Sequence, residues 1–274
     1  MVTTSKLNCS LCRSENTLLV REIFERPEGE TDFKISESDY QRSYFRCHDC
    51  GVYFADHNYD FEELYQGDYN ASTYASEVRN TYDRIMSLPV GKSDNRIRCA
   101  RVDKFLNRSE MEPKSSRILD VGSGLCVFLG GMMELGYRGV CVDPDPISTA
   151  HAKNIGVERA FTGSLEEIDS DETFELVTLN KVLEHVTNPV AMLMAATSHL
   201  TDDGVLYLEL PDGLGATREN DLKDREEFFI EHYYAFDEAS TRFLMESAGL
   251  KVEMIESIVE PSNKYTIIAF GTKL

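Results

Sequence analysis

The segment ILDVGSG, residues 118–124, constrains the fold most, because it is an apolar strand-like run followed at once by a tight glycine turn. Beyond residue 114, helix-like stretches alternate with the expected strands RILDV, GVCVD, ELVTLN, GVLYLEL, KVEMIES and YTIIAFG. Asn188 and Pro189 indicate a helix start, and Gly136 indicates a helix end. The alternation predicts a doubly wound, Rossmann-like α/β sheet, in which ligands bind beyond the carboxyl ends of the strands.

The turn itself discriminates between nucleotide-type ligands. Gly122 and Gly124 let the backbone bend tightly and approach a ligand without an intervening side chain. In a dinucleotide turn, GxGxxG, a third glycine lets the helix and strand close around a pyrophosphate, but Val127 occupies that position here. The turn therefore favours a ligand with an adenosine and no pyrophosphate, and S-adenosylmethionine (SAM) is such a ligand. The amides at the start of the following helix would bind its carboxylate.

Polar residues after the other expected strands complete a candidate cofactor site. Asp143 in GVCVDPDP is placed to accept hydrogen bonds from ribose hydroxyls. An acid there also fits NAD, so Asp143 alone does not discriminate, whereas the pairing of ILDVGSG with GVCVDPDP favours SAM. Ser164 and Leu165 in GSLEEID are expected beside the adenine, and Asn180, at the end of FELVTLN, is expected to face the methyl-transfer site.

Four of the seven cysteines fall in two CxxC pairs, Cys9 with Cys12 and Cys47 with Cys50. Two intervening residues let both sulfurs of a pair converge on one ion, and two pairs complete a tetrahedral set. We expect residues 1–66 to form a zinc ribbon around a structural Zn²⁺, because four protein ligands leave no open position for a substrate. A redox dithiol or unpaired thiols are the alternative, since CxxC alone also serves redox sites.

Composition restricts the partners of the chain. The 28 basic and 48 acidic residues give a net charge of −20, which disfavours nucleic acid and anionic membrane surfaces. No run of eighteen apolar residues and no signal-peptide pattern occurs, so we expect a cytoplasmic location. Residues 67–113 are interpreted as a helical linker or lid, whose tyrosines, Tyr74 among them, either fold over a ligand or pack the domains together. The oligomeric state stays open.

Read together, LDVGSG, VDPDP and VTLNKVLEH resemble the class I SAM-dependent methyltransferases over residues 114–274. The resemblance implies a seven-stranded sheet whose last strand is antiparallel, with KVEMIES and YTIIAFG as the final hairpin. It also implies cofactor contacts at a set of residues in these motifs: Asp120, Gly122, Asp143, Leu165 and Asn180.

The segment REEFFIEHYYAF holds the candidate catalytic residues. A histidine titrates near neutrality, so His232 is the expected general base, and Glu231 or a neighbouring acid is expected to orient or polarise it. The alternative for His232 is a structural role in packing or hydrogen bonding. His185 in VLEHV is interpreted as support on the cofactor side rather than as a base.

Together with the cysteine ribbon and the tyrosine-bearing segment, this EH pair resembles methyltransferases that act on nucleotide-linked deoxysugars. The resemblance implies that Glu231, His232 and Tyr74 face the substrate. Phe229 stands where that group has a tyrosine, and the sugar C-methyltransferases carry a further C-terminal domain that this sequence lacks after its last strand. We therefore expect a small hydroxylated metabolite, a sugar or nucleotide sugar, to be methylated on oxygen or nitrogen in preference to carbon.

Two other functions are consistent with the sequence. A ribosomal RNA methyltransferase can combine a zinc module with this fold, although the acidic composition disfavours it. A non-catalytic SAM-binding assembly protein can retain the cofactor turn while its ribbon serves as an interaction surface, because a fold does not fix function.

Overall fold

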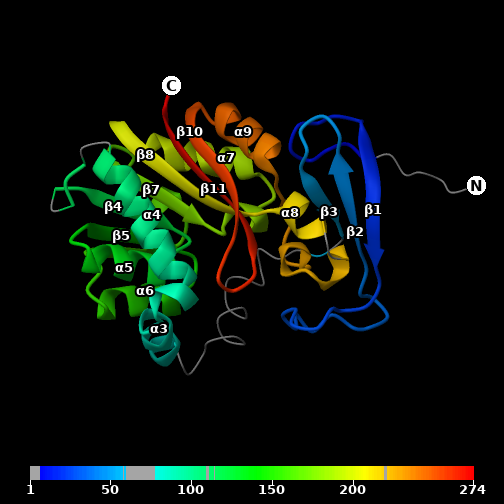
Figure 1. Cartoon of the computed structure of the whole chain (residues 1–274), viewed down its shortest axis with the longest axis horizontal. Helices are drawn as coiled ribbons and strands as arrows, with labels where there is room; N and C mark the ends of the chain where they lie inside the picture. The colour runs from blue at the N-terminus through cyan, green and yellow to red at the C-terminus, as the bar shows by residue number, and fades with distance from the viewer. Residues whose placement is uncertain (1–6, 58, 60–77, 109–110, 114, 219–220) are drawn as a thin grey trace, which may run out of the picture.

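Two β-sheets lie side by side in the computed structural model, which describes residues 7–57, 59, 78–108, 111–113, 115–218 and 221–274 (Figure 1). A seven-stranded sheet fills one lobe, and a four-stranded sheet near the N-terminus fills the other. No helix within these described ranges is long and apolar enough to span a membrane.

The seven-stranded sheet has the order β10-β11-β8-β7-β4-β5-β6. Strand β11 pairs antiparallel with both β8 and β10, whereas the pairs from β8 to β6 are parallel. This confirms the predicted doubly wound α/β fold, its antiparallel last strand and its final hairpin. The strands are β4 Arg117–Val121, β5 Arg138–Asp143, β6 Arg159–Thr162, β7 Phe174–Asn180, β8 Leu200–Pro211, β10 Leu250–Val259 and β11 Tyr265–Lys273.

Helices cover both faces of this sheet. Side chains of α4, α5 and α6 belong to one core cluster with Ile118 of β4, and side chains of α7 and α9 belong to another with Leu119. Successive strand residues point to opposite faces of the sheet, so one apolar strand contributes side chains to both clusters. The helices are α3 Val78–Met86, α4 Asp94–Arg108, α5 Val127–Glu134, α6 Pro146–Asn154, α7 Pro189–Ser198, α8 Gly213–Thr217 and α9 Glu238–Ser247.

Local capping explains where several helices begin. Asn188 caps α7 by accepting the amide of Ala191, and Pro189 is its first helical residue, as predicted. The hydroxyl of Ser93 accepts the amide of Arg96 and so caps α4. Among the residues that the structure describes, five single-turn 3-10 helices connect the larger elements: η1 Val90–Lys92, η2 Leu165–Glu167, η3 Leu183–His185, η4 Leu222–Asp224 and η5 Glu226–Phe228.

The four-stranded sheet contains a strand from the far end of the chain. Its order is β1-β2-β3-β9, with β1 at Thr17–Ile23, β2 at Arg42–Cys47, β3 at Tyr53–Asp56 and β9 at Tyr234–Ala235. The sequence analysis did not predict β9 or its pairing with β3. The N-terminal sheet is therefore completed by residues that directly follow the candidate catalytic pair.

Candidate functional site

The glycine turn lies between β4 and α5 and depends on positive backbone angles. Gly122 has φ of 68° and Gly124 has φ of 49°, both in the left-handed region that favours glycine. A Cβ at Gly122 would lie 2.7 Å from a methyl group of Val182, whereas a Cβ at Gly124 would meet no atom within 4 Å among the described residues. The first glycine thus allows close packing on the segment after β7, and the second borders open space.

Asp143, at the end of β5, is tied to this turn. One carboxylate oxygen accepts the amide of Gly124 at 2.7 Å, and the other accepts the amide of Asp145 at 2.9 Å. The side chain is 6% exposed, and burial raises the pKa of Asp143 above its ordinary value. Each carboxylate oxygen accepts more than one hydrogen bond, so the held carboxylate keeps acceptor capacity for hydroxyl donors.

Asp120 connects β4 to β7 beneath the turn. Its Oδ1 accepts the hydroxyl of Thr178 at 2.6 Å and the side-chain amide of Asn180 at 3.1 Å. Burial raises the pKa of Asp120 to about 6. Because Asn180 donates its amide to Asp120, its Oδ1 is directed elsewhere, and within the described part of the chain this buried oxygen has no partner.

These groups fit the amino-acid end and the ribose of SAM. The unpartnered Oδ1 of Asn180 can accept an ammonium, and Asp143 can accept hydroxyls. Ser164 is exposed and caps the short helix η2, while Leu165 packs into the main core cluster. A ligand at this segment would contact the backbone of residues 164–165 and not the buried side chain of Leu165.

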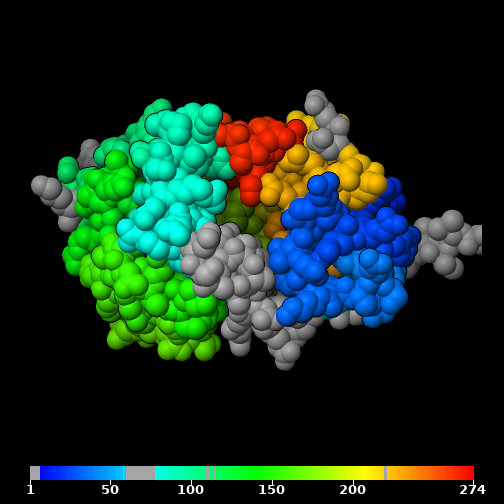
Figure 2. All heavy atoms as spheres, turned by 90° about the horizontal axis from the view of Figure 1, so that it is seen from below, coloured from blue at the N-terminus to red at the C-terminus, as the bar shows by residue number. Residues whose placement is uncertain are grey.

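A cavity of about 290 Å³ adjoins the end of β7. Figure 2 shows a recess there between helix α4 in cyan, the red β11 hairpin and the orange segment around residues 226–232. Its wall is strongly charged: the acidic, basic and histidine residues that line it are Asp94, Arg98, Lys181, Glu184, His185, Glu226, Glu227, Glu231, His232, Glu260 and Lys264. Its volume is at the low end for small-molecule sites, which are typically about 300–1,000 Å³.

Two histidines meet in this cavity. The rings of His185 and His232 are 4.7 Å apart, and nitrogen and carboxylate atoms of Glu184, His185 and His232 lie within 4.8 Å of one another. Burial lowers the pKa of His185 to about 4, and burial together with His185 lowers the pKa of His232 well below its ordinary value. Both rings are therefore neutral at pH 7, when each carries one ring proton.

Backbone carbonyls fix where those protons lie. Nδ1 of His232 is 3.1 Å from the carbonyl oxygen of Glu227, and Nδ1 of His185 is 3.1 Å from that of Glu231. A carbonyl only accepts, so Nδ1 of each neutral ring donates and Nε2 carries the lone pair. The backbone of Glu227 thus holds Nδ1 of His232. Burial raises the pKa of the Glu231 carboxyl to about 7.

The N-terminal sheet holds the loop that carries His232. The hydroxyl of Tyr44 donates to the carbonyls of His232 at 2.9 Å and Phe229 at 3.1 Å, and the amide of Ala55 donates to Tyr233 at 2.8 Å. These bonds link β2 and β3 to both sides of the candidate base. The loop that carries His232 is therefore held by the N-terminal lobe.

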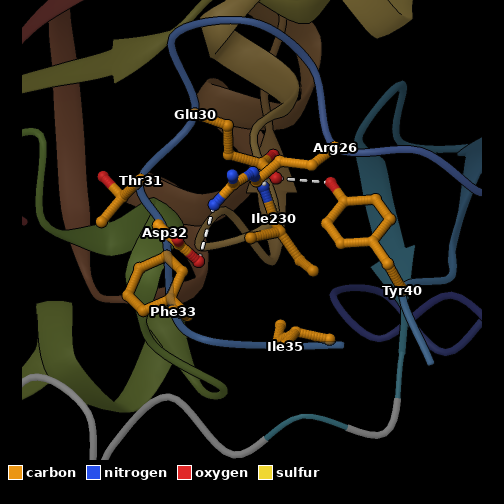
Figure 3. Close-up of a pocket in the computed structure, with 8 residues that line it drawn as sticks. All are labelled: Arg26, Glu30, Thr31, Asp32, Phe33, Ile35, Tyr40 and Ile230. Carbon is orange, nitrogen blue, oxygen red and sulfur yellow. Dashed lines mark hydrogen bonds and ion pairs between the residues drawn. The ribbon is translucent and has the colours of Figure 1, made fainter. Parts of the chain in front are cut away.

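A buried ion pair supports the same loop from the segment between β1 and β2. Glu30 pairs with Arg42 and accepts the amide of Ile230 at 2.7 Å. Figure 3 shows Ile230 among residues of this segment, beside the hydrogen bond from Tyr40 to Glu30. The sequence analysis missed Glu30 and Arg42, because Glu30 lies 200 residues from Ile230 in the sequence and meets it only in the folded chain.

The four predicted metal ligands converge. Sγ of Cys9 lies 3.8 Å from Sγ of Cys50, Sγ of Cys12 lies 3.5 Å from Sγ of Cys47, and the four sulfurs lie within 4.8 Å of one another. A tetrahedral zinc ion with Zn–S bonds of about 2.3 Å places its sulfurs about 3.8 Å apart. These distances fit such an ion and far exceed a disulfide bond of about 2.05 Å.

One predicted site residue is not among those that the structure describes. Tyr74 lies outside the described residues, so its predicted contact with the substrate stays a prediction. Lys181, Glu184 and Glu260 line the cavity, although the sequence analysis assigned them no role. Glu184 lay within the VLEHV motif, which was one available signal, whereas Glu260 reaches the cavity only through the β10–β11 turn.

Comparisons with known proteins agree with this geometry. A family described as "Methyltransferase domain" matches residues 93–255. The ubiquinone biosynthesis O-methyltransferases of Xanthomonas axonopodis pv. citri and Xanthomonas campestris pv. campestris (strain B100) are 31% and 30% identical over 107 and 100 residues. These segments cover 36% and 34% of this chain but only 45% and 42% of those proteins, so the match spans less than half of either relative.

Solved structures share the fold at low identity. Magnesium protoporphyrin IX methyltransferase from Synechocystis PCC 6803 with bound SAH superposes with a TM-score of 0.56 at 16% identity, covering 78% of this chain and 100% of that one. The 1,6-didemethyltoxoflavin-N1-methyltransferase of Burkholderia thailandensis gives 0.55 at 16% identity, covering 82% and 97%. The family match extends from the start of α4 into β10 and so includes the glycine turn, Asp143 and Asn180. This chain therefore belongs to the methyltransferase-domain family.

Proposed function

We propose that this chain transfers the methyl group of SAM to a small hydroxylated metabolite, a sugar or nucleotide sugar. The observation that carries the proposal is the unpartnered, buried Oδ1 of Asn180, which lies at the end of β7 next to the cavity that holds His232. The turn at residues 122–124, Asp143 and the backbone around Ser164 would hold the cofactor. SAM supplies a methyl group made electrophilic by its sulfonium.

The residues of the chain supply alignment and a proton acceptor. His232 keeps its proton on Nδ1, so Nε2 takes the proton of the acceptor hydroxyl or amine as that atom bonds to the methyl carbon and the carbon–sulfur bond breaks. S-adenosylhomocysteine is the product. Because His232 has a low pKa, its base form is populated at pH 7 without help from a carboxylate.

We further propose that the four cysteines hold a structural Zn²⁺. Four thiolates saturate a tetrahedral ion, so the metal supports the N-terminal sheet and takes no part in the reaction. Through Tyr44 and the β3–β9 pair, that sheet supports the loop of His232. The ribbon is then part of the acceptor site and not a separate appendage.

The decisive experiment tests for transfer and for the base together. The zinc-loaded protein is incubated with isotopically labelled SAM and a metabolite extract, and new methylated species are identified by mass spectrometry. His232→Gln should reduce turnover about 100-fold or more while SAM affinity by calorimetry stays unchanged. His199→Gln is the matched control, because His199 likewise bonds a backbone carbonyl but lies outside the cavity.

Each failure has a distinct meaning. Full turnover of His232→Gln would remove the base from the proposal. SAM binding without transfer to any metabolite would favour a non-catalytic role, and NAD binding in the absence of SAM binding would overturn the cofactor assignment.

A further inference from the structure

Three glutamates in the cavity wall are buried and have carboxylate oxygens that make no hydrogen bond within the described residues. Glu184, Glu231 and Glu260 are 0%, 6% and 5% exposed, and all three line the cavity. Within the described part of the chain, both carboxylate oxygens of Glu184 and of Glu260, and Oε2 of Glu231, make no hydrogen bond. Native proteins rarely leave buried carboxylates in this condition, because the lost solvation is not compensated.

The cations of the same wall are engaged with other groups. Arg98 pairs with Glu209 at 2.5 Å, and Lys264 pairs with Glu226 at 3.0 Å. Lys181 donates to the hydroxyl of Thr266 at 2.9 Å, although its charge also acts on Glu184 and lowers that carboxyl's pKa against the larger effect of burial. The cavity therefore contains more acid than its own cations neutralise.

The remaining acids of the wall have partners. Glu227 accepts two hydrogen bonds from Arg225, and Asp94 accepts the amide of Ser262 at 3.1 Å. The deficit is thus confined to the three unpartnered glutamates. Burial raises the pKa of Glu184 and Glu231 to about 7, because it outweighs the opposing charges of Lys181 at Glu184 and of Arg42 at Glu231.

A ligand that supplies positively charged donors would satisfy this deficit. An ammonium has three N–H donors and a full charge, and hydrogen bonds to charged groups are stronger than those between neutral groups. A phosphate or carboxylate would instead share the cavity with these acids, and like charges there are unfavourable. We propose that the acceptor of this enzyme carries an amino group, which the cavity binds as its ammonium among Glu184, Glu231 and Glu260.

This inference rests on the proposed function and narrows it to an aminated, hydroxylated acceptor such as an amino sugar. If the acceptor is nucleotide-linked, its diphosphate lies outside the cavity. The amine is a recognition group here, and the assignment holds whichever atom of the acceptor is methylated.

A matched set of probes tests the inference directly. Binding of D-glucosamine, D-glucose and D-glucose 6-phosphate to the zinc-loaded protein is measured by ligand-observed NMR titration in the presence of saturating S-adenosylhomocysteine. The amine should bind about tenfold or more tightly than the neutral sugar, and the phosphate should bind most weakly. Glu260→Gln and Glu184→Gln should each reduce the advantage of the amine, whereas Glu256→Gln, an exposed change on β10, should preserve it.

Failure of the ammonium assignment and failure of the proposed methyltransferase function would give different results. Equal binding of amine and neutral sugar, or tighter binding of the phosphate, would overturn the ammonium assignment while bound S-adenosylhomocysteine leaves the methyltransferase proposal intact. An amine advantage that persists in both glutamine variants would also overturn it. Failure of S-adenosylhomocysteine to bind at all would instead contradict the proposed function.

Discussion

Buried acids are hydrogen-bonded on the proposed cofactor side of this site, which holds Asp120 and Asp143. They are without hydrogen bonds on the proposed acceptor side, which is the cavity of His232. Asp120 and Asp143 each accept two hydrogen bonds from their own surroundings before any ligand arrives. Glu184 and Glu260 are buried to the same degree but have no hydrogen-bond partners within the described residues.

The difference teaches how one fold combines a common cofactor with a particular acceptor. The cofactor side is organised by the seven-stranded sheet and needs only backbone amides and neighbouring strands to hold its acids. The acceptor side is assembled from the N-terminal sheet, the β10–β11 turn and the loop of His232, and its acids depend on the ligand. The two sides are expected to fail independently, and each prediction below tests that independence.

Metal removal should have the largest effect. Chelation of the N-terminal cysteine cluster is expected to abolish methyl transfer, because structural zinc contributes on the order of 10–16 kcal/mol to such small modules and the loop of His232 depends on them. SAM affinity measured by calorimetry should change by no more than about threefold, which corresponds to less than 1 kcal/mol, because the expected cofactor residues lie on the seven-stranded sheet. Metal content, turnover and SAM binding are measured on the same samples. Parallel loss of SAM binding would show that the two sides are not independent.

Asp143→Ala should produce the converse defect. The change removes the acceptor for ribose hydroxyls and the partner of the Gly124 amide, so the Kd for SAM should rise about 100-fold. Zinc content should be unaffected. Asp169→Ala, an exposed acid on the loop after η2, serves as the control and should bind SAM normally. An unchanged Kd in Asp143→Ala would remove this residue from the cofactor site.

Tyr44→Phe should weaken the acceptor side alone. The hydroxyl that bonds the carbonyls of His232 and Phe229 is lost, so the loop is held less firmly and kcat should fall about fivefold, corresponding to about 1 kcal/mol. SAM affinity should be unchanged. Tyr137→Phe loses a hydroxyl bond to Asp103 within the lobe of the seven-stranded sheet and should retain kcat. If both variants lose kcat equally, the effect is general destabilisation and the positioning role of Tyr44 is wrong.

Glu184→Gln should alter the pH dependence of stability in the ligand-free protein. Burial raises the folded-state pKa of Glu184 from its ordinary 4.5 to about 7, so its carboxyl favours folding below pH 4.5 and loses that contribution as the pH rises through 7. Glutamine does not titrate. The free energy of unfolding of the Glu184→Gln variant should therefore fall less between pH 5 and 8 than that of the wild type, by on the order of 1 kcal/mol. Urea denaturation at several pH values measures this, with Glu256→Gln as the control. Identical slopes in wild type and Glu184→Gln would contradict it.

Six strands of the seven-stranded sheet were predicted from the sequence, because they are largely apolar runs with local boundary signals, whereas β6 was not among them and a seventh strand was implied only by the family resemblance. Asn188, Pro189 and the glycine turn identify element boundaries within a few residues of chain. Strand β9 was missed because it has two residues, Tyr234 and Ala235, and forms only by pairing with distant β3. A strand that short has no periodicity to detect.

The candidate site shows the same division between local and long-range information. Two CxxC pairs predicted a cluster that the structure brings together, because each pair sets its own spacing. The predicted role of Glu231 in orienting His232 stays a prediction, and the bond that the structure shows to the His232 ring comes from the backbone of Glu227. Backbone acceptors and unpartnered glutamates carry no sequence motif, so they become visible only in three dimensions.

The pairing of β3 with β9 also has a consequence for synthesis of the chain. Tyr53 leaves the ribosome 182 residues before its partner Ala235, which at typical elongation rates is roughly 10–40 s. During that interval the third strand presents an open edge to the cell. Early capture of zinc by the two cysteine pairs would keep the first three strands in register until the last one is made, so metal supply would govern the yield of the newborn protein.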